Sequence, residues 1–348
     1  MIARRSLLAG IVPALALAGR AAVTAAQEPI PIRFVLDWKY EGEHAQFTVP
    51  VTDGTFRRLG LNVTLDRGNG SGDTVAKVAA GAYDMGLADT YTMVRFNANN
   101  PGNRLISVAM VQDASASGVV ALRSKGINTP ADLAGKRIYA PTADAGRILF
   151  PIFAAQNNID LNSIQWNTVT SELRDSMLAR RDADAVTANT VTTVMNVRAV
   201  GVPESELAVF FYARYGVDLY GSSIVATPAF AEKNPETVRK FVSGLVHGLN
   251  AMIGDLDAAM ASLKTYDRLL EDEIEKERMR ISMRDMLITP NVRKNGLSSV
   301  DMARLDRTLK QVSPVFGIAP PTAADVYTDR YLPPASERVI LPWTAPAN

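Results

Sequence analysis

The sequence predicts an α/β protein of two lobes, each built on a parallel sheet that helices cover on both faces. Short apolar runs rich in β-branched residues alternate with helical patterns along most of the chain, which is typical of such sheets. The length of 348 residues suits two domains, although one large domain is also compatible with it. Residues 77–90 and 177–190 align without gaps, and both predict a helix, a tight turn and a short strand. Such self-similarity is expected from two lobes of like topology, or from two αβ units that merely resemble each other.

In the first half, short apolar runs predict strands, and apolar residues at helical spacing predict helices. The helix that starts at His44 should end at Gly60, because glycine terminates helices well. A turn with the sequence GNGSGD precedes the next helix. We expect strands at 32–36, 61–65, 83–88 and 105–111, with helices at 44–59 and 74–81.

The alternation continues in the second half and gives way to long helical patterns from Pro235 onward. The predicted strands are 118–124, 136–140, 164–169, 184–188, 207–212 and 222–227. The predicted helices are 129–135, 145–157 and 172–180, followed by a C-terminal helical extension through 259, 271–286 and 300–312. We place lobe one at 27–118 plus 222–348 and lobe two at 119–221. Two crossing strands near 117–121 and 220–224 would form a hinge.

The first 26 residues predict a cleaved export signal. Arg4 and Arg5 precede the apolar stretch LLAGIVPALALAG, and small residues lead to Gln27. The paired arginines are compatible with a twin-arginine signal and with an ordinary secretory signal. The stretch is too short for a membrane span of about 20 residues. No comparable apolar run follows, so we expect a soluble, exported mature chain.

Charge and composition exclude several functions. Formal net charge is +1, and removal of the first 26 residues with their three arginines would make it −2. Without a basic cluster the mature chain lacks an electrostatic footprint for nucleic acid or for anionic lipid. The chain contains no cysteine, which excludes disulfides, thiolate nucleophiles and cysteine-ligated metals.

Polar and aromatic residues follow the predicted strands, where ligands of open α/β sheets bind. Trp38 and Tyr40 follow the first strand, where a ring can stack on a flat ligand, although Trp38 could also cap the sheet core. The glycine-rich turn offers backbone N–H groups to a ligand, but a plain capped turn is equally compatible with it. Asp89 and Asn189 could bond a ligand or cap the helices that follow them. We predict ligand contacts from Trp38, Tyr40, His44, Asn69, Ser71, Asp89, Thr90, Thr142, Asp144, Asn189 and Tyr220.

The chain has two histidines, His44 and His247. His44 lies near several carboxylates and could be a metal ligand, a general base or a hydrogen-bond partner of the ligand, and we favour the last. Two distant histidines without thiols argue against a metal site. A serine–histidine triad lacks a supporting motif such as GxSxG. We therefore predict no metal and no catalytic residue, and a structural role for His247.

Five segments carry a family resemblance in the family's order along the chain. They are DWKYEGEHAQF (37–47), GSGDTVAKVAAGAYDMGLAD (70–89), LAGKRIYAP (133–141), KNPETVRKFVSGLVHGLN (233–250) and TAADVYTDRYL (322–332). With them the sequence resembles the binding proteins and enzymes of the thiamine-pyrimidine precursor family. The resemblance implies the type II periplasmic-binding-protein fold, two α/β lobes with a hinge. It also implies a periplasmic protein that delivers a small ligand to an ABC permease in the inner membrane. We expect a monomer.

The same resemblance raises an enzymatic alternative. Fungal members make the pyrimidine from pyridoxal phosphate and carry a cysteine-rich segment before the NPxxVRKF helix. The matching stretch here, YGVDLYGSSIVATPAF (215–230), has no cysteine. Lys39 and His44 fall near positions that the enzymes use. The missing cysteines and the export signal nevertheless lead us to expect a binding protein rather than an enzyme, with no cofactor.

The aromatic residues guide the choice of ligand. Trp38, Tyr40, Tyr215 and Tyr220 favour a planar heteroaromatic or aromatic molecule similar to a pyrimidine precursor. Sulfonate-, taurine- and riboflavin-type binding are the alternatives, and sulfonate or nitrate would call for clustered basic residues. A ligand-sensing protein without a permease is a second function class, and the enzyme is a third.

Overall fold

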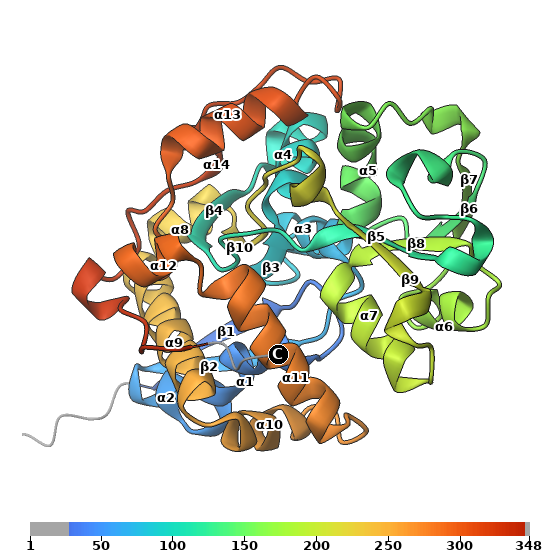
Figure 1. Cartoon of the computed structure of the whole chain (residues 1–348). Coiled ribbons are helices and arrows are strands. Elements are labelled where there is room, and N and C mark those ends of the chain that lie inside the picture. Colours follow the sequence, from blue (N-terminus) through green and yellow to red (C-terminus); the bar gives the residue numbers. More distant parts are fainter. Residues whose placement is uncertain (1–27, 345–348) are drawn as a thin grey trace, which may run out of the picture.

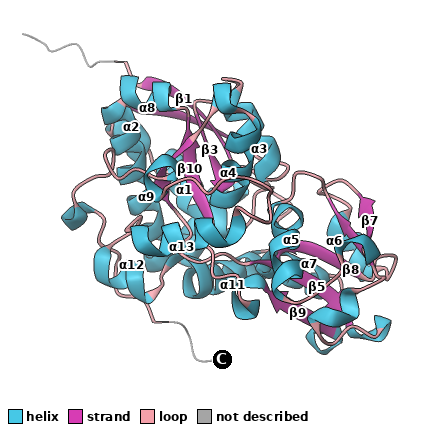
Figure 2. Cartoon of the chain, turned by 90° about the horizontal axis from the view of Figure 1, so that it is seen from above, coloured by secondary structure: helices cyan, strands magenta, loops and turns pink. Residues whose placement is uncertain are grey.

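The computed structural model describes residues 28–344 and contains two five-stranded sheets, each flanked by helices (Figures 1 and 2). The predicted export signal, residues 1–26, lies outside the described residues. We call the first sheet with its helices lobe one and the second sheet with its helices lobe two. Among the helices of the described residues, none combines the length and the apolar character that crossing a bilayer requires.

The two sheets share one topology. The strand order is β2-β1-β3-β10-β4 in lobe one and β7-β6-β8-β5-β9 in lobe two. The strands of lobe one are β1 (Ile30–Val35), β2 (Leu61–Asp66), β3 (Met85–Asp89), β4 (Ile106–Met110) and β10 (Ser222–Ala226). Those of lobe two are β5 (Ser117–Leu122), β6 (Arg137–Ala140), β7 (Gln165–Thr168), β8 (Ala185–Asn189) and β9 (Leu207–Phe211). The self-similar sequence segments include β3 and β8, which hold equivalent places in the two sheets. The predicted fold class is confirmed.

The prediction of purely parallel sheets is wrong for one strand in each lobe. β10 runs antiparallel to β3 and β4, and β5 runs antiparallel to β8 and β9. These are the two strands that receive the chain after it has crossed from the other lobe. The crossing segments enter at the edge where the parallel strands end, so the strand that follows must run away from that edge. The predicted lobe boundaries fall within β5 and at the start of β10.

The helices lie around both sheets (Figure 2). In the first two-thirds of the chain they are α1 (Ala45–Thr52), α2 (Thr55–Arg58), α3 (Ser71–Ala79), α4 (Thr90–Asn99), α5 (Ala145–Gln156), α6 (Arg174–Ala179), α7 (Thr190–Ala199) and α8 (Pro228–Lys233). The C-terminal part adds α9 (Pro235–Gly254), α10 (Leu256–Lys264), α11 (Asp272–Ser282), α12 (Pro290–Asn295), α13 (Met302–Val312) and α14 (Ala323–Val326). The helix expected over 44–59 is divided by Gly54, whose φ of 78° is left-handed and breaks the helix. At 129–135 only a 3₁₀ turn forms, over Pro130–Leu133.

Aromatic stacking joins the C-terminal helices to the core of lobe one. Phe241 of α9 stacks on Phe34 of β1 and on Phe56 of α2, with ring centroids 4.8 and 5.1 Å apart. The ring centroid of Phe47, in α1, lies 5.3 Å from the ring centroid of Phe34. Helix α9 is therefore part of the lobe-one core. Burial of rings of this size supplies much of the hydrophobic stabilisation of a core.

Gly248 permits the close packing of α9 on α1. A Cβ at this position would lie 1.9 Å from the backbone oxygen of Gln46. We predict that Gly248→Ala lowers the free energy of unfolding by about 1–3 kcal/mol, because the helices must move apart. Gly254→Ala in the same helix meets no atom within 4 Å and should be neutral or stabilise by up to about 1 kcal/mol. Urea unfolding of both variants tests this, and equal stability would refute the packing argument.

Candidate ligand-binding cleft

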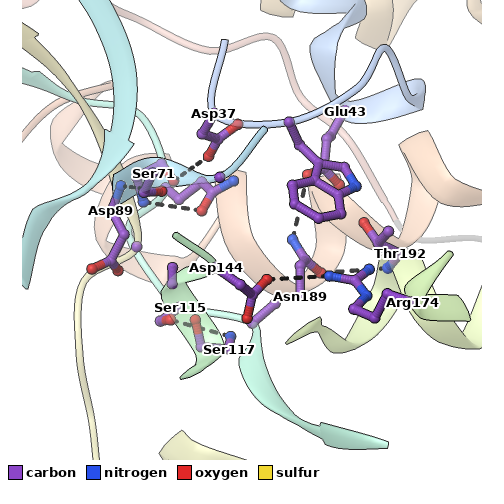
Figure 3. A pocket seen from close by; sticks show the side chains of 18 residues that line it. Asp37, Glu43, Ser71, Asp89, Ser115, Ser117, Asp144, Arg174, Asn189 and Thr192 are labelled. Carbon is purple, nitrogen blue, oxygen red and sulfur yellow. Dashed lines mark hydrogen bonds and ion pairs between the residues drawn. The ribbon is translucent and has the colours of Figure 1, made fainter. Parts of the chain in front are cut away.

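A cavity of about 60 Å³ lies between the lobes, at the carboxyl ends of strands from both sheets (Figure 3). Lobe one contributes the segment after β1, the start of α3 and the end of β3. Lobe two contributes the starts of α5 and α7 and one residue of α6. Both crossing segments complete the wall. The lining residues are Asp37, Trp38, Glu43, Gly70, Ser71, Asp89, Gln112, Ser115, Ala116, Ser117, Asp144, Ala145, Gly146, Arg174, Asn189, Thr192, Gly221 and Ser222.

Three of these residues are placed by helix capping. Asp89 caps α4, with its Oδ1 accepting the Thr92 N–H at 2.7 Å. Asp144 caps α5 and Asn189 caps α7 in the same way. Capping requires a side-chain oxygen at the point where a strand turns into a helix. That point is also where the cavity lies, so the capping role and the cavity-lining position occur together.

Arg174 is the one basic residue in the lining, and each of its three side-chain nitrogens has a partner within the protein. Its side chain is 1% exposed, with Nε 2.8 Å from Asp175 Oδ1 and Nη1 3.2 Å from Asp144 Oδ2. Its Nη2 donates to Thr193 at 3.1 Å. Burial by itself would raise the pKa of Asp175, but the Arg174 guanidinium lowers that pKa to about 2. The pair is therefore held in its charged form.

Trp38 meets Arg174 across the cleft. The guanidinium carbon lies 4.5 Å from the centroid of the indole ring, within the range of a cation–π contact. Trp38 comes from the segment after β1, and Arg174 begins α6 in the other lobe. The indole Nε1 is buried and has no hydrogen-bond partner among the described residues. The ring thus forms a wall of the cavity and a contact between the lobes.

Further contacts join the lobes around the cavity. Asn189 Nδ2 donates to Glu43 Oε1 at 3.3 Å (Figure 3). Thr192 Oγ1 donates to Glu41 at 2.6 Å. The glycine-rich turn touches lobe two directly, because the Gly72 N–H donates to the backbone oxygen of Ala143 at 2.9 Å. The lobes are therefore in contact at several points around the cavity.

The walls are acidic. Asp37, Glu43, Asp89 and Asp144 line the cavity, while the charge of Arg174 is shared with Asp144 and Asp175. Burial raises the pKa of Glu43 to about 7 and that of Asp89 to about 7. Burial also raises the pKa of Asp144 despite its contact with Arg174. Within residues 28–344, no group of three or more acidic, histidine or cysteine side chains is placed to hold a metal ion.

Five of the eleven residues predicted to contact a ligand line this cavity. They are Trp38, Ser71, Asp89, Asp144 and Asn189. Their contact with a ligand stays a prediction. Sequence reasoning did not select Arg174, Thr192 and Gln112, because a lone arginine, threonine or glutamine in a helix or crossing segment has no distinguishing pattern.

The other six predicted residues lie outside the lining. His44 is buried behind Asp37, with Nδ1 accepting the Glu41 N–H and Nε2 3.3 Å from the Asp37 carboxylate. Thr90 donates to the backbone oxygen of Gly221. The remaining four are Tyr40, which donates to the Leu65 backbone, Tyr220, which is covered by Arg304, and the exposed Asn69 and Thr142. The structure thus brings His44 and Thr90 close to the cavity wall without placing them on it.

The chain matches a known protein family over more than half of its length. The NMT1/THI5-like family matches residues 41–259. The chain belongs to the NMT1/THI5-like family. It is 24% identical over 262 residues to the formylaminopyrimidine-binding protein of Halalkalibacterium halodurans, covering 73% of this chain and 77% of that protein. The family resemblance predicted from the sequence is thereby confirmed.

Solved structures of periplasmic binding proteins share the fold. The alkanesulfonate-binding protein SsuA from Xanthomonas axonopodis, bound to MOPS, has a TM-score of 0.68 at 16% identity, over 87% of this chain and 99% of its own. The periplasmic nitrate-binding protein NrtA from Synechocystis has a TM-score of 0.65 at 9% identity, over 88% of each chain. At these identities the likeness concerns the fold alone. This NMT1/THI5-like chain therefore has the two-lobed fold of periplasmic binding proteins.

The buried Arg174 pair should be essential for the stability of lobe two. We predict that Arg174→Met lowers the free energy of unfolding by about 3–5 kcal/mol, because Asp144 and Asp175 would be left as buried carboxylates without their cation. Arg180→Met removes an arginine whose pair with Asp182 is exposed, and it should cost less than about 1 kcal/mol. Urea unfolding at neutral pH compares the two. Equal losses would mean that the buried pair does not stabilise the cleft.

Proposed function

We propose that this protein is an exported solute-binding protein that closes its lobes around a small planar heteroaromatic molecule, similar to a pyrimidine precursor, and delivers it to an ABC importer. The observation that carries the proposal is the cavity between two lobes of like topology, with strand ends of both sheets in its wall. Ligands of open α/β sheets bind at this edge. Family membership and the fold both support a binding role.

The chemistry of the wall supports a nitrogen heterocycle over an oxyanion. Trp38 offers a large aromatic surface, and carboxylates accept hydrogen bonds from N–H groups. A sulfonate or nitrate would need unpaired cations, whereas Arg174 already contacts two carboxylates. The relative from Halalkalibacterium halodurans is named for binding formylaminopyrimidine, which favours the same class. Sulfonate-type and riboflavin-type binding remain the alternatives.

Ligand entry requires movement of the lobes. A cavity of about 150 Å³ is the size that accepts benzene, and the cavity here is about 60 Å³. Two chain crossings connect the sheets, after β4 and after β9. A hinge near 117–121 and 220–224 would let the lobes separate and close again, as in other hinged binding proteins.

The cavity wall also supports binding over catalysis. A synthase that uses pyridoxal phosphate needs a lysine to hold it as a Schiff base, and within residues 28–344 no lysine lines this cavity. Lys39 follows Trp38 but lines a different pocket. We propose accordingly that the protein has no catalytic residue, and that it acts in the periplasm as a monomer with an inner-membrane ABC permease. The predicted export signal at residues 1–26 supports the periplasmic location, whether export follows the twin-arginine route or the ordinary secretory route.

A ligand screen tests the proposed function. Thermal unfolding with pyrimidines, flavins, aromatic acids and sulfonates should identify a planar nitrogen heterocycle that raises the unfolding temperature. Solution scattering should show a more compact protein with that compound than without it. The compound should also be recovered chemically unchanged. A chemically altered compound would indicate an enzyme, and stabilisation by sulfonates alone would reject the proposed ligand class.

Trp38 should contribute directly to affinity. We predict that Trp38→Ala weakens binding of the stabilising compound by about 1–3 kcal/mol, the range of base–aromatic stacking, or about 5- to 150-fold in Kd. Trp343→Ala is the matched control, because Trp343 stacks on Arg293 at the C-terminal end and does not line the cavity. Isothermal titration calorimetry measures both. An unchanged Kd for Trp38→Ala would remove this ring from the binding site.

A further inference from the structure

Helix α11 of the C-terminal extension contacts both lobes (Figure 1). On the lobe-one side it packs against α10 and against the 3₁₀ turn Gly42–His44, whose first N–H donates to the Glu275 carboxylate at 2.6 Å. On its other side it packs against α7 of lobe two. The segments before and after α11 belong to lobe one, so the helix is a part of lobe one that reaches across to lobe two.

Arg278 of α11 lies at this contact and is fully buried. Two carboxylates of lobe one pair with it, since Nε lies 2.8 Å from Glu275 and Nη1 lies 3.5 Å from Glu41. The same guanidinium donates to α7, from Nη1 to the backbone oxygen of Thr192 at 3.1 Å and from Nη2 to Asn196 Oδ1 at 2.7 Å. Arg278 does not line the cavity, so it joins the lobes without facing a ligand.

The contacts of Arg278 respond differently to separation of the lobes. Glu41 and Glu275 belong to its own lobe, so these ion pairs can persist when the lobes move apart. The bonds to Thr192 and Asn196 exist only while the lobes are together. Hydrogen bonds to an ionised group are roughly twice as strong as those between neutral groups. Separation would therefore break two charge-assisted hydrogen bonds of a buried guanidinium.

Asn196 connects Arg278 to the buried arginine of lobe two. Its Oδ1 accepts from Arg278, and its Nδ2 donates to Asp175 at 2.6 Å. Asp175 in turn pairs with Arg174, which lies over the Trp38 ring. Only one orientation of the amide satisfies a cation on one side and a carboxylate on the other. A continuous line of contacts thus runs from α11 through lobe two to the Trp38 wall of the cavity.

The same helix also contacts a crossing of the chain between the lobes. Beyond Ser282 it continues as a π-helical segment, Met283–Leu287. The backbone oxygen of Met286 accepts the N–H of Ala114 at 3.3 Å, and Ala114 lies in the crossing between β4 and β5. Segments of π-helix often occur at functional sites. This helix therefore connects the contact with α7 to one of the crossings about which the lobes would move.

We propose that α11 is a latch, in which Arg278 holds lobe two against lobe one through Thr192 and Asn196 and raises the affinity of the cleft without contacting a ligand. The proposal rests on the proposed function, because a latch affects binding only if the lobes open and close around a ligand. Where the closed arrangement is the binding-competent one, the apparent Kd equals the intrinsic Kd divided by the closed fraction. Loss of the latch should therefore weaken every bound compound by the same factor. Arg278 is a positioning residue.

Lobe separation is measurable without a ligand. The chain has no cysteine, so Leu269→Cys before α11 and Val200→Cys after α7 can carry a pair of spin labels at side chains that are 90% and 69% exposed. We expect mainly short distances between the labels in the otherwise unmodified protein. Arg278→Lys should raise the ratio of separated to closed molecules at least about tenfold. Lysine keeps the charge beside Glu41 and Glu275 but lacks the planar fork that bonds both lobe-two acceptors.

Arg198→Lys is the matched control. Arg198 of α7 pairs with Glu277 of α11 at 3.2 Å across the same contact, but both side chains are exposed to solvent. Exposed pairs contribute little, so the label distances should not change. Asn196→Ala removes one lobe-two acceptor, leaves Arg278 with its lobe-one carboxylates and should shift the distances in the same direction as Arg278→Lys. Thermal unfolding verifies that each variant is folded.

Affinity is the second measurement, with 4-aminopyrimidine and cytosine as probes in calorimetry. Arg278→Lys should weaken both by the same factor, at least about fivefold. Unchanged label distances in the folded Arg278→Lys and Asn196→Ala proteins, or a loss of affinity confined to one probe, would overturn the latch and leave the proposed function standing. Failure of both probes and of every compound in the wider screen would overturn the proposed function, and the ligand-free distances would still decide whether Arg278 holds the lobes together.

Discussion

Each sheet has four strands that run toward the cleft and one that runs away from it, and the site depends on this constraint. Because β5 and β10 receive the crossing chain, they run antiparallel to their neighbours and leave the other strands parallel. Parallel strands end at one edge and are followed there by helix starts with free N–H groups. Asp89, Asp144 and Asn189 satisfy these groups as caps. The capping requirement of three separate helices thereby brings polar side chains from both lobes to one cavity.

The electrostatics of the two walls differ, and the difference follows from where the arginine lies. In lobe two, Arg174 contacts both Asp144 and Asp175 and lowers the pKa of Asp175, although burial still raises the pKa of Asp144. In lobe one, Arg278 is paired with Glu41 and Glu275 behind the wall, while Glu43 and Asp89 face the cavity with few donors. Burial favours the protonated carboxyl, and the Arg174 guanidinium outweighs burial at Asp175 but not at Asp144. The same residue type thus has a pKa of about 2 at Asp175 and about 7 at Asp89.

The sequence predicts the parts of this arrangement that local rules govern. Alternating strands and helices, the signals for helix starts and the rule for strand ends identify Trp38, Asp89 and Asn189 as cavity residues. Other features depend on contacts between distant segments. Tyr220 is covered by Arg304, whose guanidinium lies 4.0 Å from the ring and comes from α13. His44 turns toward Asp37 because the Glu41 N–H meets its other nitrogen. The antiparallel direction of β5 and β10 depends on which lobe the chain comes from, and no pattern within either strand encodes this.

Burial of Glu43 and Asp89 opposes the stability of the folded protein. Their pKa values are raised in the folded protein, so folding favours their protonated forms, and their effect on stability becomes less favourable as the pH rises through the unfolded pKa toward about 7. A ligand that donates hydrogen bonds to these carboxylates would offset this cost, because it would bind them only in the folded protein. Replacing Glu43 and Asp89 with apolar residues would remove the cost of burying two carboxyl groups. It would also remove the hydrogen-bond acceptors that they offer to a ligand. Carboxyl groups that destabilise the free protein are thus consistent with a site whose full set of partners includes the ligand.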